Sequence, residues 1–117
     1  MLRVYSYKGC DSCRKALKWL KDRDVEFENR AIRDTPPSPD ELRAMLERYE
    51  GKLKRLFNVS GQDYRKLGLK ETLPEMSDEE AIELLSRNGN LIKRPFVTGS
   101  KVQEVGFKPE EWESLGF

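Results

Sequence analysis

The amino-acid sequence predicts a single α/β domain in which a mixed β-sheet carries helices on its faces. Three observations lead to this fold class. A strand, a helix and a second strand follow one another within residues 2–32. Helix-start signals with apolar residues at helical spacing then occupy residues 38–89, and a hairpin pattern with a short helix fills residues 95–112. Strands and helices combined in one short chain in this way are typical of a packed α/β domain.

The N-terminal unit is a strand–helix–strand pattern. Residues 2–7 read as a strand, and Val25 and Phe27 alternate with charged residues in a second strand that extends to Ile32. Because the intervening segment is helical, we expect the two strands to be parallel. The helix is predicted over residues 12–23, where four side chains have the spacing of one helical face: Cys13, Ala16, Leu17 and Leu20.

The middle of the chain opens with a strong helix-start signal. Ser38 offers a capping hydroxyl, Pro39 suits the first helical position, and Glu41 stands three residues after the cap. We expect this helix to close at Gly51, since glycine is favoured just beyond a helix end. Its apolar stripe, which we interpret as core-facing, consists of Leu42, Met45, Leu46 and Tyr49.

Two further helices are predicted before the hairpin. A short one covers residues 62–66 and ends at Gly68. A second capping box, Ser77 to Glu80, opens a helix that ends at Asn88-Gly89. Its inward side chains are Ala81, Ile82 and Leu85.

The last third of the sequence predicts a β-hairpin and a terminal helix. Residues 95–98 and 102–105 flank a turn at residues 99–101, and a helix starts at Pro109. The sequence has no internal repeat and no linker composition, so one domain over residues 1–117 is expected.

Composition and charge exclude several classes of function. Apolar and charged residues each make up 37% of the chain, which suits a compact protein with a solvated surface. The net charge is only +1, with both signs interspersed, so we expect no direct contact with nucleic acid or with anionic membrane. No apolar run approaches the length of a membrane span, and residues 1–8 do not resemble a secretion signal. We therefore expect a cytoplasmic location.

The two cysteines, Cys10 and Cys13, are the whole cysteine content, and the sequence contains no histidine. A disulfide framework needs more cysteines, and a tetrahedral zinc site needs four ligands. The lack of histidine also excludes Cys–His and Ser–His–Asp catalysis. We expect neither a metal nor a bound cofactor.

The position of the Cys10-x-x-Cys13 motif favours thiol–disulfide chemistry. Cys10 follows the first strand and immediately precedes the first helix, so the helix dipole and free N–H groups stabilise its thiolate. Lys8, Arg14 and Lys15 add positive charge. Cys13, one turn inside the helix, is placed to resolve a mixed disulfide. The alternative is two unrelated thiols, with Cys13 merely filling the apolar stripe.

An ordered set of motifs resembles the ArsC family, which includes arsenate reductases, the Spx/MgsR regulators and the YffB-type proteins. The set begins with Tyr5, continues through Cys10-x-x-Cys13-Arg14-Lys15-Ala16 and reaches Trp19-Leu20. It goes on through residues 64–69 and 91–95 and ends at Val105-Gly106-Phe107. The resemblance therefore extends over essentially the whole chain.

The resemblance implies a thioredoxin-like fold with a helical insertion and a reductase site. It implies a cis Pro95 beside the active cysteine and an Arg94 that faces Cys10 and binds an oxyanion such as arsenate. Ser12, Asn58 and Pro95 are the expected substrate pocket, and glutathione, glutaredoxin or thioredoxin the expected electron donor. The alternative for Arg94 is an ordinary surface residue.

Departures from the reductase pattern keep a second class of function open. The resemblance to the family's reductases fails at Asn58 and Lys108, because the reductases have an arginine at each of these positions. This difference weakens the case for arsenate as the substrate. The Spx branch shares the Cys-x-x-Cys pair and has a glycine near Gly51 that contacts RNA polymerase. A redox-sensing regulator that binds the polymerase α subunit is therefore the alternative to a reductase, although Gly51 also fits a plain helix end. We expect a monomer in either case.

Overall fold

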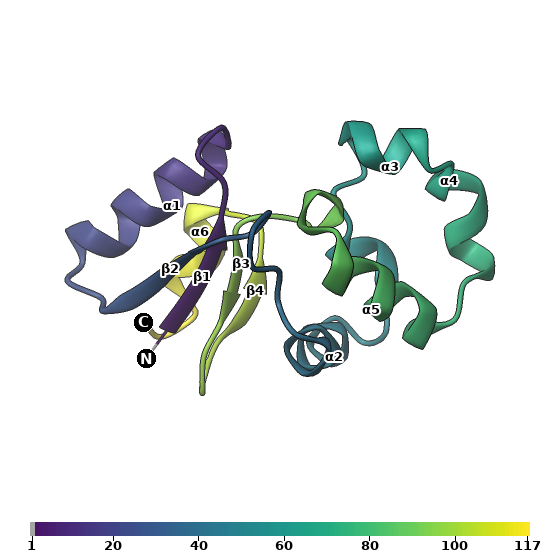
Figure 1. Ribbon diagram of the computed structural model, residues 1–117. Coiled ribbons are helices and arrows are strands. Elements are labelled where there is room, and N and C mark those ends of the chain that lie inside the picture. Colours follow the sequence, from purple (N-terminus) through teal and green to yellow (C-terminus); the bar gives the residue numbers. More distant parts are fainter. Residues whose placement is uncertain (1) are drawn as a thin grey trace.

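The computed structural model describes residues 2–117 and contains a four-stranded mixed sheet (Figure 1). The strands are β1 (Leu2–Ser6), β2 (Phe27–Ala31), β3 (Phe96–Thr98) and β4 (Gln103–Val105), in the order β2-β1-β3-β4. β1 pairs with β2 in parallel, which confirms the prediction for the N-terminal unit. β3 is antiparallel to both β1 and β4, so the predicted hairpin is also confirmed.

One face of the sheet is covered by α1 (Asp11–Asp22) and α6 (Pro109–Glu113). Successive side chains of a strand point to opposite faces, so Val4 of β1 and Val97 of β3 meet these helices. They form a small apolar cluster with Ala16 and Leu20 of α1 and with Trp112 of α6. This half of the molecule lies around α1 in Figure 1.

The other half is a helical insertion between β2 and β3. Its α-helices are α2 (Pro39–Arg48), α3 (Gln62–Lys66), α4 (Leu69–Thr72) and α5 (Asp78–Arg87). Two short 3-10 turns, Leu53–Leu56 and Leu73–Glu75, lie between these helices, and a third, Gly89–Leu91, follows α5 and leads to β3. Neither α4 nor the 3-10 turns were predicted, because segments of three or four residues are too short to show helical periodicity.

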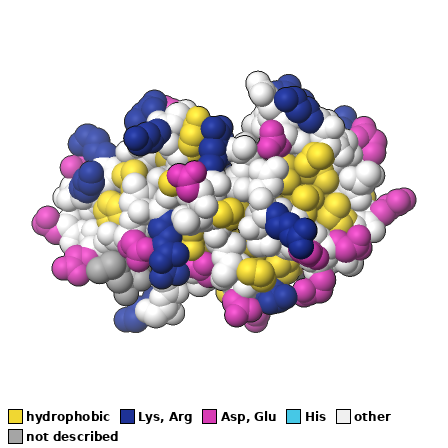
Figure 2. Space-filling view, viewed as in Figure 1, with side chains coloured by type: hydrophobic (Ala, Val, Ile, Leu, Met, Phe, Trp, Pro, Cys, Tyr) yellow, Lys and Arg dark blue, Asp and Glu magenta, His cyan; other side chains and the backbone are white. Residues whose placement is uncertain are grey.

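The insertion and the second face of the sheet share the larger apolar cluster. Tyr5, Phe96 and Val105 from the sheet pack in the same cluster as the buried side chains of the insertion. The predicted stripe residues are all buried there: Leu42, Met45, Leu46, Tyr49, Ala81, Ile82 and Leu85. Figure 2 shows hydrophobic side chains gathered over the helical half of the visible face, with charged side chains of both signs over both halves.

The predicted helix starts at Ser38 and Ser77 are confirmed. In each, the serine hydroxyl accepts the N–H of the glutamate three residues later, and that glutamate accepts the serine N–H. The end of α2 is more complex than a single glycine. Glu50 and Gly51 both have positive φ, and the Gly51 N–H donates to the Leu46 carbonyl at 2.9 Å.

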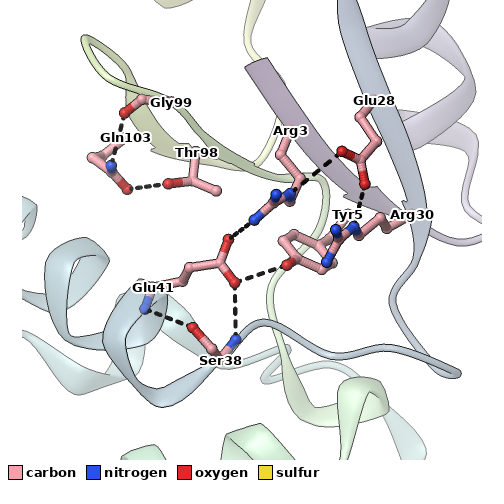
Figure 3. Close-up of polar contacts among 9 residues, drawn as sticks. All are labelled: Arg3, Tyr5, Glu28, Arg30, Ser38, Glu41, Thr98, Gly99 and Gln103. Carbon is pink, nitrogen blue, oxygen red and sulfur yellow. Dashed lines mark hydrogen bonds and ion pairs between the residues drawn. The ribbon is translucent and has the colours of Figure 1, made fainter. Parts of the chain in front are cut away.

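Glu41 also fastens α2 to the sheet (Figure 3). Its carboxylate accepts the Tyr5 hydroxyl at 2.8 Å and an Arg3 N–H at 3.0 Å, in addition to its bond with the Ser38 N–H. These hydrogen bonds outweigh the cost of burial and lower the pKa of Glu41, whereas burial and the neighbouring carboxylate raise the pKa of Tyr5.

A close backbone approach joins the insertion to the end of β2. Gly89 is buried, and a Cβ there would overlap the Ile32 carbonyl oxygen. The glycine predicted as a helix stop is thus required for packing as well. Within residues 2–117, no helix is long and apolar enough to cross a membrane, and no cluster of three potential metal ligands occurs.

Candidate active site

Cys10 lies at the junction of β1 and α1. Its backbone N–H donates to the Tyr7 carbonyl at 3.1 Å, and its extended backbone makes it the N-cap of α1. Its sulfur accepts the Cys13 N–H at 3.2 Å, one of the helix N–H groups that lack an intrahelical partner. Half-buried Cys10 therefore presents its sulfur at the positive end of the helix dipole.

Cys13 lies behind Cys10 and is almost completely buried. Burial, together with a hydrogen bond to Cys10, raises the pKa of Cys13 from its ordinary value of 9.0 to about 12. The thiol of Cys13 therefore keeps its proton at neutral pH. Of the two sulfurs, the one that an external reagent can reach and attack is Cys10.

The charged residues of the first turn of α1 are partly neutralised. Arg14 and Lys15 both pair with Asp11, at 3.3 and 3.2 Å, and these contacts lower the pKa of Asp11. Arg14 also donates to the Lys8 carbonyl at 2.9 Å. The Asp11 carboxylate thus partly neutralises the positive charge that was expected from Arg14 and Lys15.

Arg94 approaches the cysteine pair from the start of β3. Its positive charge opposes the rise in the pKa of Cys13, and its guanidinium lies 5.2 Å from the centre of the Tyr7 ring. Arg33 stacks on the same ring at 3.7 Å. One terminal nitrogen of Arg94, Nη1, is buried and has no hydrogen-bond partner within residues 2–117. The Arg94–Pro95 peptide bond is cis, as the family resemblance implied.

A cleft of about 300 Å³ opens beside Arg94; we call it the Arg94 cleft. Four of its lining residues are basic, and Glu111, whose carboxylate is 4.0 Å from the Lys108 amine, is its one acidic residue. Such a cleft suits an anion with several oxygens. The lining residues are Ser12, Arg55, Lys93, Arg94, Val105, Gly106, Phe107, Lys108 and Glu111.

The structure brings together some of the predicted pocket residues and not others. Ser12 and Arg94 line the Arg94 cleft, and Ser12 stands between the two cysteines in sequence. Pro95 is buried next to it but does not line it. Asn58 lies elsewhere: its N–H donates to the Leu91 carbonyl at 2.7 Å and its side chain is directed to the Ser60–Gly61 turn.

Three residues of this region were missed from the sequence. Arg55 takes the place in the cleft that was expected for Asn58, and the Tyr7 ring lies near Arg94 and is stacked by Arg33. Tyr7 and Arg33 have no sequence signal beyond their nearness to the cysteines and to β2. Arg55 belongs to the basic segment of residues 52–55, but only the folded insertion places it beside Arg94.

Comparisons with known proteins agree on one family. A model of the ArsC family matches residues 5–115. The uncharacterized protein YusI of Bacillus subtilis (strain 168) is 46% identical over 112 residues, covering 96% of this chain and 95% of YusI. The global transcriptional regulator Spx of Enterococcus faecalis (strain ATCC 700802 / V583) is 32% identical over 111 residues, covering 95% of this chain and 83% of Spx.

A solved structure supports the same conclusion. The crystal structure of a possible arsenate reductase from Streptococcus mutans UA159 matches with a TM-score of 0.88 and 38% identity, covering 97% of this chain and 98% of the other. The chain therefore belongs to the ArsC family, and its mixed sheet with helices is the thioredoxin-like fold expected from the sequence.

Proposed function

We propose that this protein is a thiol–disulfide oxidoreductase that cycles Cys10 and Cys13 between dithiol and disulfide. The observation that carries the proposal is the difference between the two cysteines. Cys10 is half-buried at the N-cap of α1, whereas Cys13 is buried and keeps its proton. The Cys13 backbone nitrogen lies 3.2 Å from the Cys10 sulfur. One sulfur is prepared to attack and the other to resolve.

The proposed cycle is balanced in electrons and protons. The Cys10 thiolate attacks one sulfur of a substrate disulfide, the substrate S–S bond breaks, and the departing thiolate takes the proton that Cys13 gives up. Cys13 then attacks the Cys10 sulfur and releases the second substrate thiolate. The products are a reduced substrate and a Cys10–Cys13 disulfide, which glutathione, glutaredoxin or thioredoxin would reduce with two electrons.

The same two electrons would also serve an oxyanion such as arsenate, which would leave as the reduced oxyanion and water. The basic lining of the Arg94 cleft and the unpartnered Nη1 of Arg94 support this candidate substrate. This chain has Asn58 where the family's reductases have an arginine. Arg55 and Lys108 line the cleft with Arg94 and supply positive charge in place of that arginine.

A redox-sensing regulator that acts with the RNA polymerase α subunit is the second candidate. Its support is the similarity to Spx together with Gly51, which is exposed, has a φ of +81° and has open space around the position of a Cβ. A glycine that is free of packing and follows a helix end is available to a partner.

One paired experiment separates the two candidates. Turnover is measured with protein disulfides and with arsenate, in the presence of glutathione–glutaredoxin or of a thioredoxin system, and retention of RNA polymerase is measured with the same reduced and oxidised protein. Turnover that Cys10→Ser abolishes supports the reductase. Redox-dependent retention of polymerase without turnover supports the regulator. If the protein shows neither turnover nor retention of polymerase, both candidate functions are excluded.

A further inference from the structure

A second basic cleft continues the Arg94 cleft along the outer edge of β4. This second cleft, also of about 300 Å³, lies between the end of α2 and α6 and includes Arg48 and Lys52. Arg55 and Glu111 line both clefts, so the two clefts adjoin at these residues, and together they are here called the β4 groove. One end of the groove is at Ser12, next to the cysteines, and the other is at the α2 terminus.

The β4 groove concentrates positive charge in a chain that is otherwise almost neutral. Its lining contains six basic residues and three acidic ones, whereas the whole chain carries a net charge of only +1. One of the three carboxylates, that of Glu104, is buried and already accepts hydrogen bonds from the Tyr49 hydroxyl at 3.0 Å and from Arg48 at 3.2 Å. The groove therefore attracts an extended anionic partner.

The partner must be recognised through its side chains and not by strand addition. β4 is an edge strand, but side chains from the end of α2 already bond two of its outer backbone groups. The Val105 N–H donates to the Tyr49 hydroxyl at 3.1 Å, and the Gln103 carbonyl accepts the Arg48 Nε–H at 3.2 Å. An incoming peptide thus finds this part of the ladder interrupted and meets the basic side chains that interrupt it.

We propose that the β4 groove binds an acidic, extended segment of the polypeptide whose disulfide Cys10 attacks. This inference rests on the proposed thiol–disulfide function and specifies its substrate class: a protein disulfide flanked by Asp or Glu residues. Carboxylates along the groove hold the segment by charge, and the end at Ser12 delivers the disulfide to Cys10. A polypeptide suits the groove better than a nucleic acid, because its carboxylates can be spaced to face the basic side chains and avoid Glu50 and Glu111, whereas both glutamates would repel a continuous phosphate backbone.

The test uses synthetic peptides and a closely matched pair of lysines. Lys52 lines the β4 groove, whereas Lys54, two residues later in the same segment, lines a different cleft of the insertion. Both lysines are exposed, and neither forms an ion pair within residues 2–117. K52E and K54E therefore change the charge equally, and neither breaks an ion pair of the described residues. Arg55→Gln serves as a second groove variant.

Reduction of a disulfide-bonded peptide with four flanking glutamates is compared with that of the same peptide carrying glutamines. We expect the glutamate peptide to react about tenfold faster at low salt, with the advantage lost at high salt. K52E and Arg55→Gln should reduce the advantage severalfold, and K54E should leave it unchanged. Equal rates for the two peptides, or equal effects of K52E and K54E, would overturn the proposal.

Two further measurements separate failure of this inference from failure of the proposed function. Binding of a cysteine-free glutamate peptide, followed by fluorescence anisotropy, reports on the groove alone. Reduction of a small uncharged disulfide reports on the thiols alone. A protein that reduces the small disulfide but does not bind the glutamate peptide refutes the groove, as does tighter binding of a single-stranded DNA oligonucleotide. A protein that binds the peptide but reduces no disulfide refutes the oxidoreductase.

Discussion

The two faces of the sheet are packed in different ways: α1 and α6 cover one face and form with the sheet the cysteine half of the molecule, and the helical insertion packs on the other face. In the cysteine half the contacts are mainly apolar and aromatic: Trp112 of α6 packs edge-to-face on Trp19 of α1 at 5.5 Å and on Phe107 at 4.8 Å. A hydrogen bond from the Trp112 indole N–H to the Gly106 carbonyl, at 3.1 Å, ties α6 to the end of β4. The insertion adds polar ties to its apolar contacts, through Glu41 at the start of α2 and Tyr49 at its end. Specific hydrogen bonds therefore fix how the insertion is placed on the sheet.

The two parts of the molecule also contribute different residues to the candidate site. The cysteine half by itself positions the thiol pair, because β1, the N-terminus of α1 and the start of β3 all belong to it. The insertion contributes Arg48, Lys52 and Arg55 to the β4 groove. We therefore expect changes in the insertion to alter stability and substrate choice, and changes at the cysteines to alter the chemistry itself.

The largest effect on stability is predicted at the contact between the insertion and β2. Gly89→Ala should lower the free energy of unfolding by about 3 kcal/mol, because the added Cβ overlaps the Ile32 carbonyl and the backbone must move. Gly51→Ala is the matched control: it meets no neighbouring atom and should cost only about 1 kcal/mol through its positive φ. Urea denaturation measures both, and equal losses would contradict this account of Gly89.

The next effect concerns the polar ties of α2. Tyr49→Phe should cost about 1–2 kcal/mol, because it leaves the buried Glu104 carboxylate and the Val105 N–H without the hydroxyl between them. Tyr5→Phe should cost less, since Glu41 keeps its bonds to Arg3 and Ser38. A lower denaturant midpoint for Tyr5→Phe than for Tyr49→Phe would mean that the hydrogen bonds at the end of α2 stabilise the fold less than the one at its start.

The pH dependence of stability should reveal the buried thiol. The pKa of Cys13 is raised on folding, so its contribution is fully present below pH 9 and is lost as the pH rises toward 12. The difference in unfolding free energy between the reduced protein and Cys13→Ala should therefore shrink above pH 9, by at most about 1.4 kcal/mol per pH unit. A difference that stays constant from pH 7 to about 10.5 would be at odds with a buried, protonated Cys13.

A smaller effect is expected on the reactivity of Cys10. Arg94→Ala removes a cation near the cysteine pair and should slow alkylation of Cys10 by about two- to fivefold at neutral pH. Arg94→Lys should retain most of the rate while weakening oxyanion binding, because it keeps the charge and loses the planar fork. Lys15→Ala is the control, since Lys15 is already paired with Asp11. An alkylation rate unaffected by Arg94→Ala would make Arg94 irrelevant to the thiol.

The fold was predictable where local signals are strong and agree with one another. The capping boxes at Ser38 and Ser77 and the strand–helix–strand pattern led to the correct helices and to the parallel pair β1–β2. The short turns between α2 and α5 were not predictable, since tertiary packing and not periodicity holds such segments. Helix α1 starts at Asp11, one residue before the predicted start, because Cys10 itself is the cap.

The candidate site was predictable only in part for a similar reason. The spacing of Cys10 and Cys13 and their position before a helix are local properties, and the geometry of the pair follows from them. Arg94 and Ser12 were indicated by the family resemblance, and both line the cleft. Arg55 instead of Asn58 could not be anticipated, because its place depends on how the insertion turns after α2 and brings residues 53–57 against residues 92–93.

The most direct test of the central claim is the product of mild oxidation of the full chain. The unequal pair predicts an intramolecular Cys10–Cys13 disulfide, seen by mass spectrometry as a monomer that has lost two hydrogen atoms. Before oxidation, alkylation should modify Cys10 first and Cys13 only after denaturation. A spectrum dominated by disulfide-linked dimers or by sulfenic acid at Cys10, or equal alkylation of both cysteines in the folded protein, would contradict the account.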